Sequence, residues 1–165
     1  MISRTATLAG FMKSTQVSTV IKAPRPVVYK AFLDPAALAA WRVPENMTAR
    51  VHSFEAREGG IYRMSLTYRD ARQSPGGKTS EDTDTFQGRF VELVPDEKIV
   101  EAITFESDAP GFAGEMKMTT RLADVEGGTE VTMLCQDLPA GIRPEDNETG
   151  TRQSLHKLAA LLEKG

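Results

Sequence analysis

Several features that would point to particular functions are scarce in this sequence of 165 residues. Its one cysteine, Cys135, excludes an intramolecular disulfide and a metal site built on several cysteines. No apolar run approaches the roughly 18 residues that a membrane-spanning helix requires. The 20 basic residues are outnumbered by 23 acidic ones, whereas nucleic-acid-binding surfaces usually need a basic excess. We therefore expect no membrane span, no nucleic-acid partner and no cofactor.

Histidine is almost as scarce as cysteine. His52 and His156 are the only two, and both fall on polar faces of their predicted elements, where we expect solvent exposure. Neither has a carboxylate or cysteine at ligand spacing, so the sequence predicts no metal site. The serines and acids form no recognisable nucleophile motif, so no catalytic group is assigned on this ground.

The N-terminal segment has an apolar patch over residues 8–12, interrupted by Gly10. A secretory signal needs about 7–15 apolar residues and a small-residue cleavage site. We therefore interpret residues 1–14 as a flexible leader, residues 15–165 as a single domain, and the location as cytoplasmic.

Alternating apolar and polar residues predict seven strands, two short helices and one long helix. Pro35 divides the helical pattern after the first strand, with Asp34 placed to cap the second short helix. Leu155, Leu158 and Leu162 give the last helix one apolar face. The predicted strands are 15–22, 47–55, 61–68, 84–94, 99–106, 115–125 and 130–138, and the last helix is 144–163. The polar segment 69–82 is either a mobile flap or a solvated turn.

This order predicts an α+β fold, in which a curved antiparallel sheet of six or seven strands wraps around the C-terminal helix. A long helix on a strongly twisted sheet leaves gaps at its ends. The sequence therefore favours a cavity between the sheet and the helix.

Four segments then suggest a family: IKAPRPVVYKAFLDPAALAAW at 21–41, REGGIYRM at 57–64, GRFVELVPDEKIV at 88–100 and EGGTEVT at 126–132. With the last helix, their order resembles the activator of heat-shock protein 90 ATPase homologue-like branch of the START/Bet v 1-like (SRPBCC) superfamily. The resemblance covers nearly the whole chain from about residue 15 and implies a helix-grip fold. One departure is Thr151, which follows Gly150 where members of this branch often carry a tryptophan.

The resemblance implies binding of a hydrophobic or aromatic small molecule in the cavity. It also implies two alternatives, a co-chaperone-type module that stimulates a heat-shock ATPase and a polyketide cyclase/hydrolase-like enzyme. The eukaryotic co-chaperones resemble this sequence through one of their domains only. The predicted partner is an apolar small molecule; a chaperone partner and a homodimer are left open.

We select candidate ligand-binding residues from the alternation of the strands and from the apolar face of the last helix. They share an apolar or aromatic character and a predicted inward direction, and methionine in particular adapts to irregular ligands. They are Trp41, Tyr62, Met64, Leu66, Tyr68, Phe86, Phe90, Met116, Met118, Met133, Leu155 and Leu162.

Glu101 is the one acid that the alternation places on the same strand face as the apolar residues Ile99 and Ile103. A buried Glu101 could act as an acid or base, which makes it a weak catalytic candidate. The favoured interpretation places its strand at a sheet edge and the carboxyl in water. Tyr68, Trp41 or Glu101 could supply a polar contact to a ligand.

Overall fold

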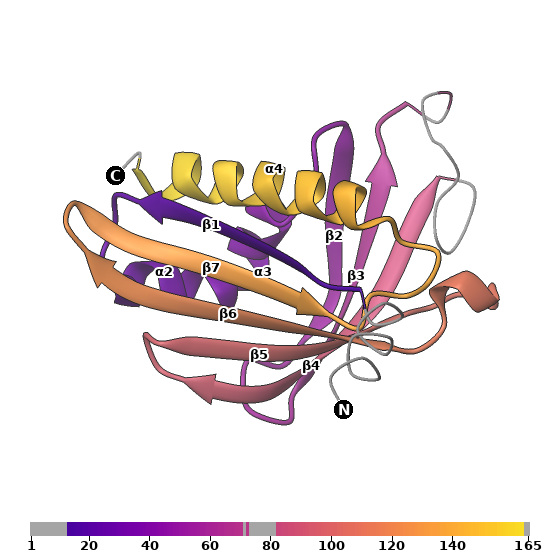
Figure 1. The fold of residues 1–165 in the computed structure, drawn as a ribbon, viewed down its shortest axis with the longest axis horizontal. Helices are drawn as coiled ribbons and strands as arrows, with labels where there is room; N and C mark the ends of the chain where they lie inside the picture. The colour runs from indigo at the N-terminus through magenta and orange to yellow at the C-terminus, as the bar shows by residue number, and fades with distance from the viewer. Residues whose placement is uncertain (1–12, 71, 73–81, 164–165) are drawn as a thin grey trace, which may run out of the picture.

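The computed structural model describes residues 13–70, 72 and 82–163. Most of the predicted leader and of the segment 69–82 lies outside this part. The elements follow in the predicted order of one strand, two helices, six strands and one helix (Figure 1). They are β1 (Thr15–Ile21), α2 (Arg25–Phe32), α3 (Pro35–Trp41), β2 (Met47–Phe54), β3 (Ile61–Tyr68), β4 (Thr83–Val94), β5 (Lys98–Phe105), the short 3-10 helix η2 (Pro110–Phe112), β6 (Glu115–Val125), β7 (Gly128–Gln136) and α4 (Pro144–Glu163).

All seven strands form one antiparallel sheet in the order β1-β7-β6-β5-β4-β3-β2. The register shifts between Val51 and Ser53 in β2 and between Phe90 and Glu92 in β4. Such bulges bend a strand and increase its twist, which helps the sheet to curve. The predicted α+β helix-grip architecture is confirmed.

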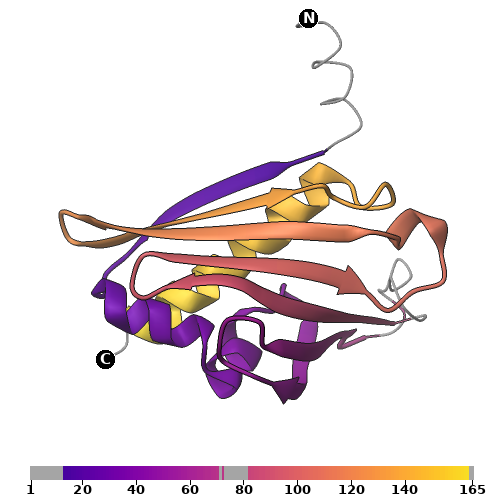
Figure 2. The same cartoon turned by 90° about the horizontal axis from the view of Figure 1, so that it is seen from below.

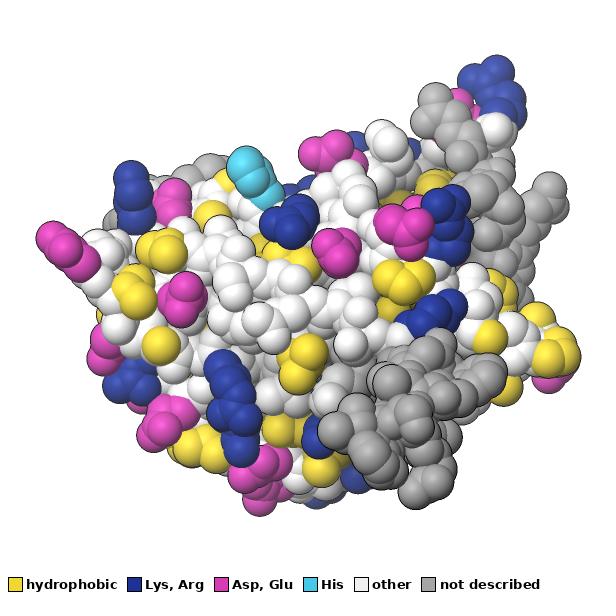
Figure 3. Space-filling model, viewed as in Figure 1, with side chains coloured by type: hydrophobic (Ala, Val, Ile, Leu, Met, Phe, Trp, Pro, Cys, Tyr) yellow, Lys and Arg dark blue, Asp and Glu magenta, His cyan; other side chains and the backbone are white. Residues whose placement is uncertain are grey.

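The helices close the open side of the curved sheet (Figures 1 and 2). α4 packs against β1 at one edge, and α3 packs against β2 at the other edge and against α4. The chain thus forms a continuous wall of sheet, α4 and α3 around an interior. Basic and acidic side chains are interspersed on the face that carries α4 (Figure 3).

Local sequence explains how α3 begins and how its end is held. The Asp34 side chain accepts a 3.0 Å hydrogen bond from the Ala36 N–H, and Pro35 occupies the first turn of α3, as predicted. The indole N–H of Trp41, the last residue of α3, donates to the Ala31 carbonyl over 3.0 Å and so ties the helix back to α2. These contacts fix the residue that follows, Arg42, at the end of α3.

Candidate functional site

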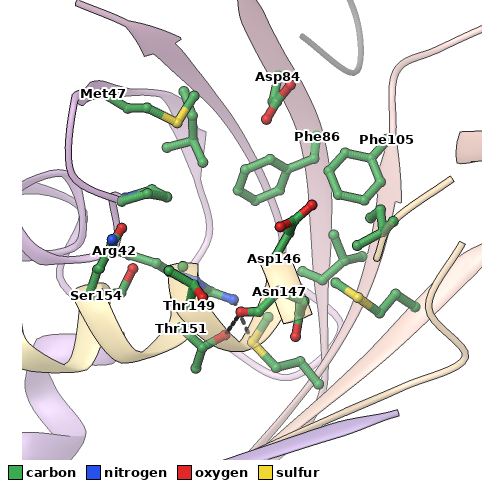
Figure 4. Close-up of a pocket in the computed structure, with 18 of the residues that line it drawn as sticks. Arg42, Met47, Asp84, Phe86, Phe105, Asp146, Asn147, Thr149, Thr151 and Ser154 are labelled. Atoms are coloured by element: carbon green, nitrogen blue, oxygen red, sulfur yellow. Dashed lines mark hydrogen bonds between the residues drawn. The ribbon is translucent and has the colours of Figure 1, made fainter. Parts of the chain in front are cut away.

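A cavity of about 750 Å³ lies between the sheet and the N-terminal half of α4 (Figure 4). In Figure 4, Phe86 of β4 and Phe105 of β5 face Asp146, Asn147 and Thr151 of α4 across this space. The two phenyl rings form an edge-on pair with centroids 6.0 Å apart. The sheet side of the cavity therefore offers a mainly apolar and aromatic wall.

The α4 side of the cavity is lined by short or polar side chains. Asn147 anchors this stretch, because its Oδ1 accepts a 2.5 Å hydrogen bond from the Thr15 hydroxyl of β1. Its backbone carbonyl accepts another, of 2.8 Å, from the Thr151 hydroxyl. Gly150 contributes no side chain at all, and Ser154 ends the lining on this helix. The helix thus leaves room between itself and the sheet.

Gly150 is not required by close packing. A Cβ built at this position would meet only the Pro44 side chain, at an ordinary contact distance of 3.7 Å. A glycine in a helix interior costs about 1 kcal/mol relative to alanine. The sequence nevertheless has glycine where a side chain would project towards the cavity.

A buried polar cluster of three side chains lies beside the cavity. The Glu101 Oε1 accepts a 2.8 Å hydrogen bond from Nη1 of Arg42 and a 2.5 Å hydrogen bond from the Tyr62 hydroxyl. Glu101 is fully buried and the Arg42 side chain is 9% exposed. Of the three, only Arg42 also lines the cavity.

The position of Tyr62 in this cluster depends on a glycine in the next strand. Tyr62 of β3 pairs with Gly88 of β4 in the sheet register. A Cβ at Gly88 would lie only 2.1 Å from Cζ of Tyr62, so the ring occupies the space that a side chain would fill. Gly88 therefore lets the phenol lie flat on β4 and reach Glu101.

The cluster shifts the pKa values of its members. Burial alone would lower the pKa of Arg42, but the attraction and hydrogen bond of Glu101 outweigh it and raise that pKa above its usual value. Burial raises the pKa of Tyr62 strongly; Arg42 opposes this effect and the Glu101 charge adds to it. Arg42 therefore stays a cation and Tyr62 a neutral hydrogen-bond donor.

The expectation that Glu101 lies in water on an edge strand is wrong. β5 lies between β4 and β6, and Glu101 is fully buried. Alternation identifies the residues that share a face, but it does not give the place of a strand in the sheet. The partner Arg42 was missed because it lies 59 residues away in sequence, at the end of a short helix.

The structure divides the predicted ligand-binding residues into two groups. Seven line the cavity: Trp41, Leu66, Tyr68, Phe86, Met116, Met118 and Met133. Five do not: Tyr62, Met64 and Phe90 are fully packed in the core, Leu155 is buried further along α4, and Leu162 is partly buried beyond it. The cavity lies under the polar first half of α4, whereas its leucines pack in the second half.

Trp41 and Tyr68, two of the residues predicted to give a ligand a polar contact, differ in whether their polar group is free. The indole N–H of Trp41 already donates to Ala31 and the side chain is fully buried, so Trp41 has no free donor to offer a ligand. The Tyr68 hydroxyl has its pKa raised by burial and by the nearby charges of Asp84 and Asp146. Tyr68 is therefore a neutral phenol at the cavity wall.

The remaining candidates give no second site in the part of the chain that is described. His52 and His156 are exposed, as predicted. Within residues 13–70, 72 and 82–163, His, Cys, Asp and Glu side chains form no group of three or more that could hold a metal ion. None of the described helices combines the length and the apolar character needed to cross a bilayer.

Comparison with known proteins identifies the family of the chain. The family model of the Activator of Hsp90 ATPase homolog 1-like protein matches residues 22–163. Among solved structures, protein CV1439 from Chromobacterium violaceum is 36% identical, with a TM-score of 0.80 and coverage of 91% of this chain and 96% of that chain. Among curated proteins, none matches significantly.

Two more distant structures share the fold. A protein from Arthrobacter aurescens has a TM-score of 0.75 at 18% identity, covering 92% of this chain and 87% of its own. Protein Ms6760 from Mycobacterium smegmatis has a TM-score of 0.71 at 15% identity, covering 90% of each chain. At these identities the likeness concerns the fold alone.

Proposed function

Since the chain belongs to the Activator of Hsp90 ATPase homolog 1-like family, whose helix-grip fold encloses a space under its last helix, we propose that this protein binds a hydrophobic or aromatic small molecule there. The observation that carries the proposal is the cavity of about 750 Å³, with Phe86, Phe105 and Met118 in its wall. Small-molecule sites are typically cavities of roughly 300–1,000 Å³ with mostly apolar walls and a few placed polar groups.

Gly150 gives independent support to this proposal. Its cost to helix stability is about 1 kcal/mol, and the 3.7 Å contact to Pro44 shows that packing would tolerate alanine. A destabilising residue that no neighbour requires is typical of a functional position. Here its effect is to widen the cavity at the point where α4 crosses the sheet.

The methionines of the wall support a ligand of adaptable shape. Met116, Met118 and Met133 come from β6 and β7 and all line the cavity. Their flexible, polarizable side chains can fit different apolar surfaces. A cavity with this lining suits a family of related apolar molecules better than one rigid ligand.

The test is isothermal titration calorimetry of the full-length protein against fatty acids, flavonoids and polyketides. Thr151→Trp places an indole in the cavity from α4, and His156→Trp places the same side chain on an exposed position of that helix. We expect the wild type and His156→Trp to bind one ligand class with equal affinity, and Thr151→Trp to bind it at least tenfold more weakly. Failure of every ligand, or equal binding by all three proteins, contradicts the proposal.

The family description favours one second candidate, a co-chaperone-type module that stimulates a heat-shock ATPase. Such a module acts through its surface, so Thr151→Trp should leave ATPase stimulation unchanged. Stimulation of a purified Hsp90 by the wild type and by Thr151→Trp alike, together with no ligand binding, would favour this second function. A cytoplasmic location, which suits both functions, stays a prediction.

A cyclase- or hydrolase-like enzyme requires a reacting group in contact with the substrate. Glu101 is fully buried and only its partner Arg42 lines the cavity. Turnover of a bound polyketide that disappears in Glu101→Gln while binding persists would establish an enzyme instead of a carrier.

A further inference from the structure

Arg42 is the residue through which the buried cluster meets the cavity. Its guanidinium carries five N–H donors. One donates to Glu101 over 2.8 Å, and another lies 2.9 Å from the sulfur of Met118, which is a weak acceptor. Within the described part of the chain, the guanidinium also lies beside Tyr62, 5.9 Å from the centroid of its ring. A cavity-lining arginine thus retains donor capacity that the protein itself leaves largely unused.

The charge of Arg42 is already balanced. Glu101 forms an ion pair with it at 2.8 Å, in a place where both side chains are almost completely buried. The second carboxyl oxygen of Glu101, Oε2, has no hydrogen-bond partner among the described residues, so it adds negative potential beside the pair. A ligand carboxylate at Arg42 would add a second buried negative charge to one guanidinium.

The rest of the cavity adds acidic side chains. Glu45 and Asp146 both line it, and the other lining arginine, Arg143, is ion-paired with Glu145 at 3.2 Å. Like charges close together in a partly desolvated site disfavour each other. The electrostatics of this cavity therefore oppose an anionic head group, although an arginine lines its wall.

We propose that the polar end of the ligand is a neutral hydrogen-bond acceptor, such as a ketone, ester or amide carbonyl, that accepts N–H groups of Arg42. This inference rests on the proposed function, because it assumes that the cavity takes a small molecule. A carbonyl oxygen satisfies the spare donors without adding charge. Glu101 then acts as a positioning residue, since it holds the guanidinium in place and cancels its charge, and Tyr62 holds Glu101.

Four naphthalenes with nearly the same shape test this inference by calorimetry on the full-length protein. Acetylnaphthalene carries the carbonyl, ethylnaphthalene replaces its oxygen by hydrogens, naphthoate is an anion and naphthylmethylamine is a cation. We expect acetylnaphthalene to bind about tenfold or more tightly than ethylnaphthalene, since a hydrogen bond to a charged group is stronger than one between neutral groups. Naphthoate should bind more weakly than acetylnaphthalene at every salt concentration.

The possible failures are distinguishable. Equal binding of acetylnaphthalene and ethylnaphthalene overturns the inference, because Arg42 then makes no contact with the carbonyl. Naphthoate binding tightest, with an affinity that falls as salt rises, also overturns it, yet leaves the proposed function standing. If no member of the series binds and the apolar ligands described above also fail, the proposed function falls and the inference with it.

A double variant assigns the preference to Arg42 without leaving a buried charge unpaired. Arg42→Met with Glu101→Gln removes both charges, and we expect the ratio of the two dissociation constants, acetyl over ethyl, to rise to about one. The matched control is Arg63→Met with Glu106→Gln, which removes a partly exposed ion pair of the same residue types at 2.7 Å, outside the cavity lining. The control should keep the full preference for the carbonyl, and loss of it in both variants contradicts the assignment. The ligand series on the wild type decides the question even if the double variant does not fold.

Discussion

Replacement of Arg42 by methionine tests the buried cluster most severely. The variant leaves the Glu101 carboxyl fully buried, with the Tyr62 hydroxyl as its remaining hydrogen-bond donor among the described residues. Removing one partner of a buried ion pair typically costs about 3–5 kcal/mol, because the other charge stays uncompensated. The methionine side chain keeps most of the apolar stem of the arginine, so lost packing contributes little.

The size of this effect makes the assay straightforward. A domain of this size is stable by roughly 5–15 kcal/mol, so a loss of 3–5 kcal/mol lowers the midpoint of urea unfolding markedly. The midpoint of thermal unfolding should fall by about 6–20 °C, at roughly 2–4 °C per kcal/mol for a chain of this length. The double variant Arg42→Met/Glu101→Leu, which places apolar groups at both positions, should recover most of the loss.

The control for this prediction is Arg63→Met, which breaks a partly exposed ion pair with Glu106 at 2.7 Å. Water and salt screen this partly exposed pair, so Arg63→Met should cost less stability than Arg42→Met, although the pair is bidentate. A loss of less than about 1 kcal/mol in Arg42→Met, or a double variant less stable than the single one, would refute the view that Arg42 and Glu101 form a desolvated pair.

Three further predictions follow from single positions. Gly150→Ala should stabilise the protein towards urea by about 0.5–1 kcal/mol and weaken ligand binding, and a loss of stability would show that packing does require the glycine. Gly88→Ala should destabilise by at least about 2 kcal/mol, since its Cβ would lie 2.1 Å from the Tyr62 ring, and near-wild-type urea unfolding would contradict the close approach. The pKa of Glu106, lowered from 4.5 to about 2 chiefly by its hydrogen bond to Arg63, means that its stabilising contribution is present above pH 4.5 and is lost as the pH falls towards 2. Glu106→Gln should flatten that part of the curve of stability against pH, and an unchanged curve would argue against the pair.

The fold could be predicted from the sequence because its signals are local. Alternation over the strands, the turn at 126–127 and the leucine spacing of α4 all act within a few residues. The predicted helix 144–163 has the bounds of α4, and the strands agree within two residues at each end. The last strand begins at Gly128 because the turn needs only Glu126 and Gly127, and Gly127 has a φ of +89°.

The cavity could be predicted only in part, because it depends on long-range geometry. Strand parity correctly indicates that Met116, Met118 and Phe86 face inward. The leucine spacing of α4 does not show where along the helix the gap opens: it predicts Leu155 as a ligand contact, whereas Gly150 and Thr151 line the cavity. Arg42 reaches Glu101 only because α3 ends against the curved sheet, and no sequence pattern encodes that distance.

Methionine methyl NMR tests the central claim, that the space under α4 is a ligand site, most directly. The chain has seven methionines; Met47, Met116, Met118 and Met133 line the cavity, whereas Met64 is fully buried in the core outside its lining. Titration of the methyl-labelled protein with its tightest apolar ligand should shift the four lining resonances strongly and should shift that of Met64 less than any of them. Unchanged lining resonances, or a Met64 shift as large as theirs, would contradict the account.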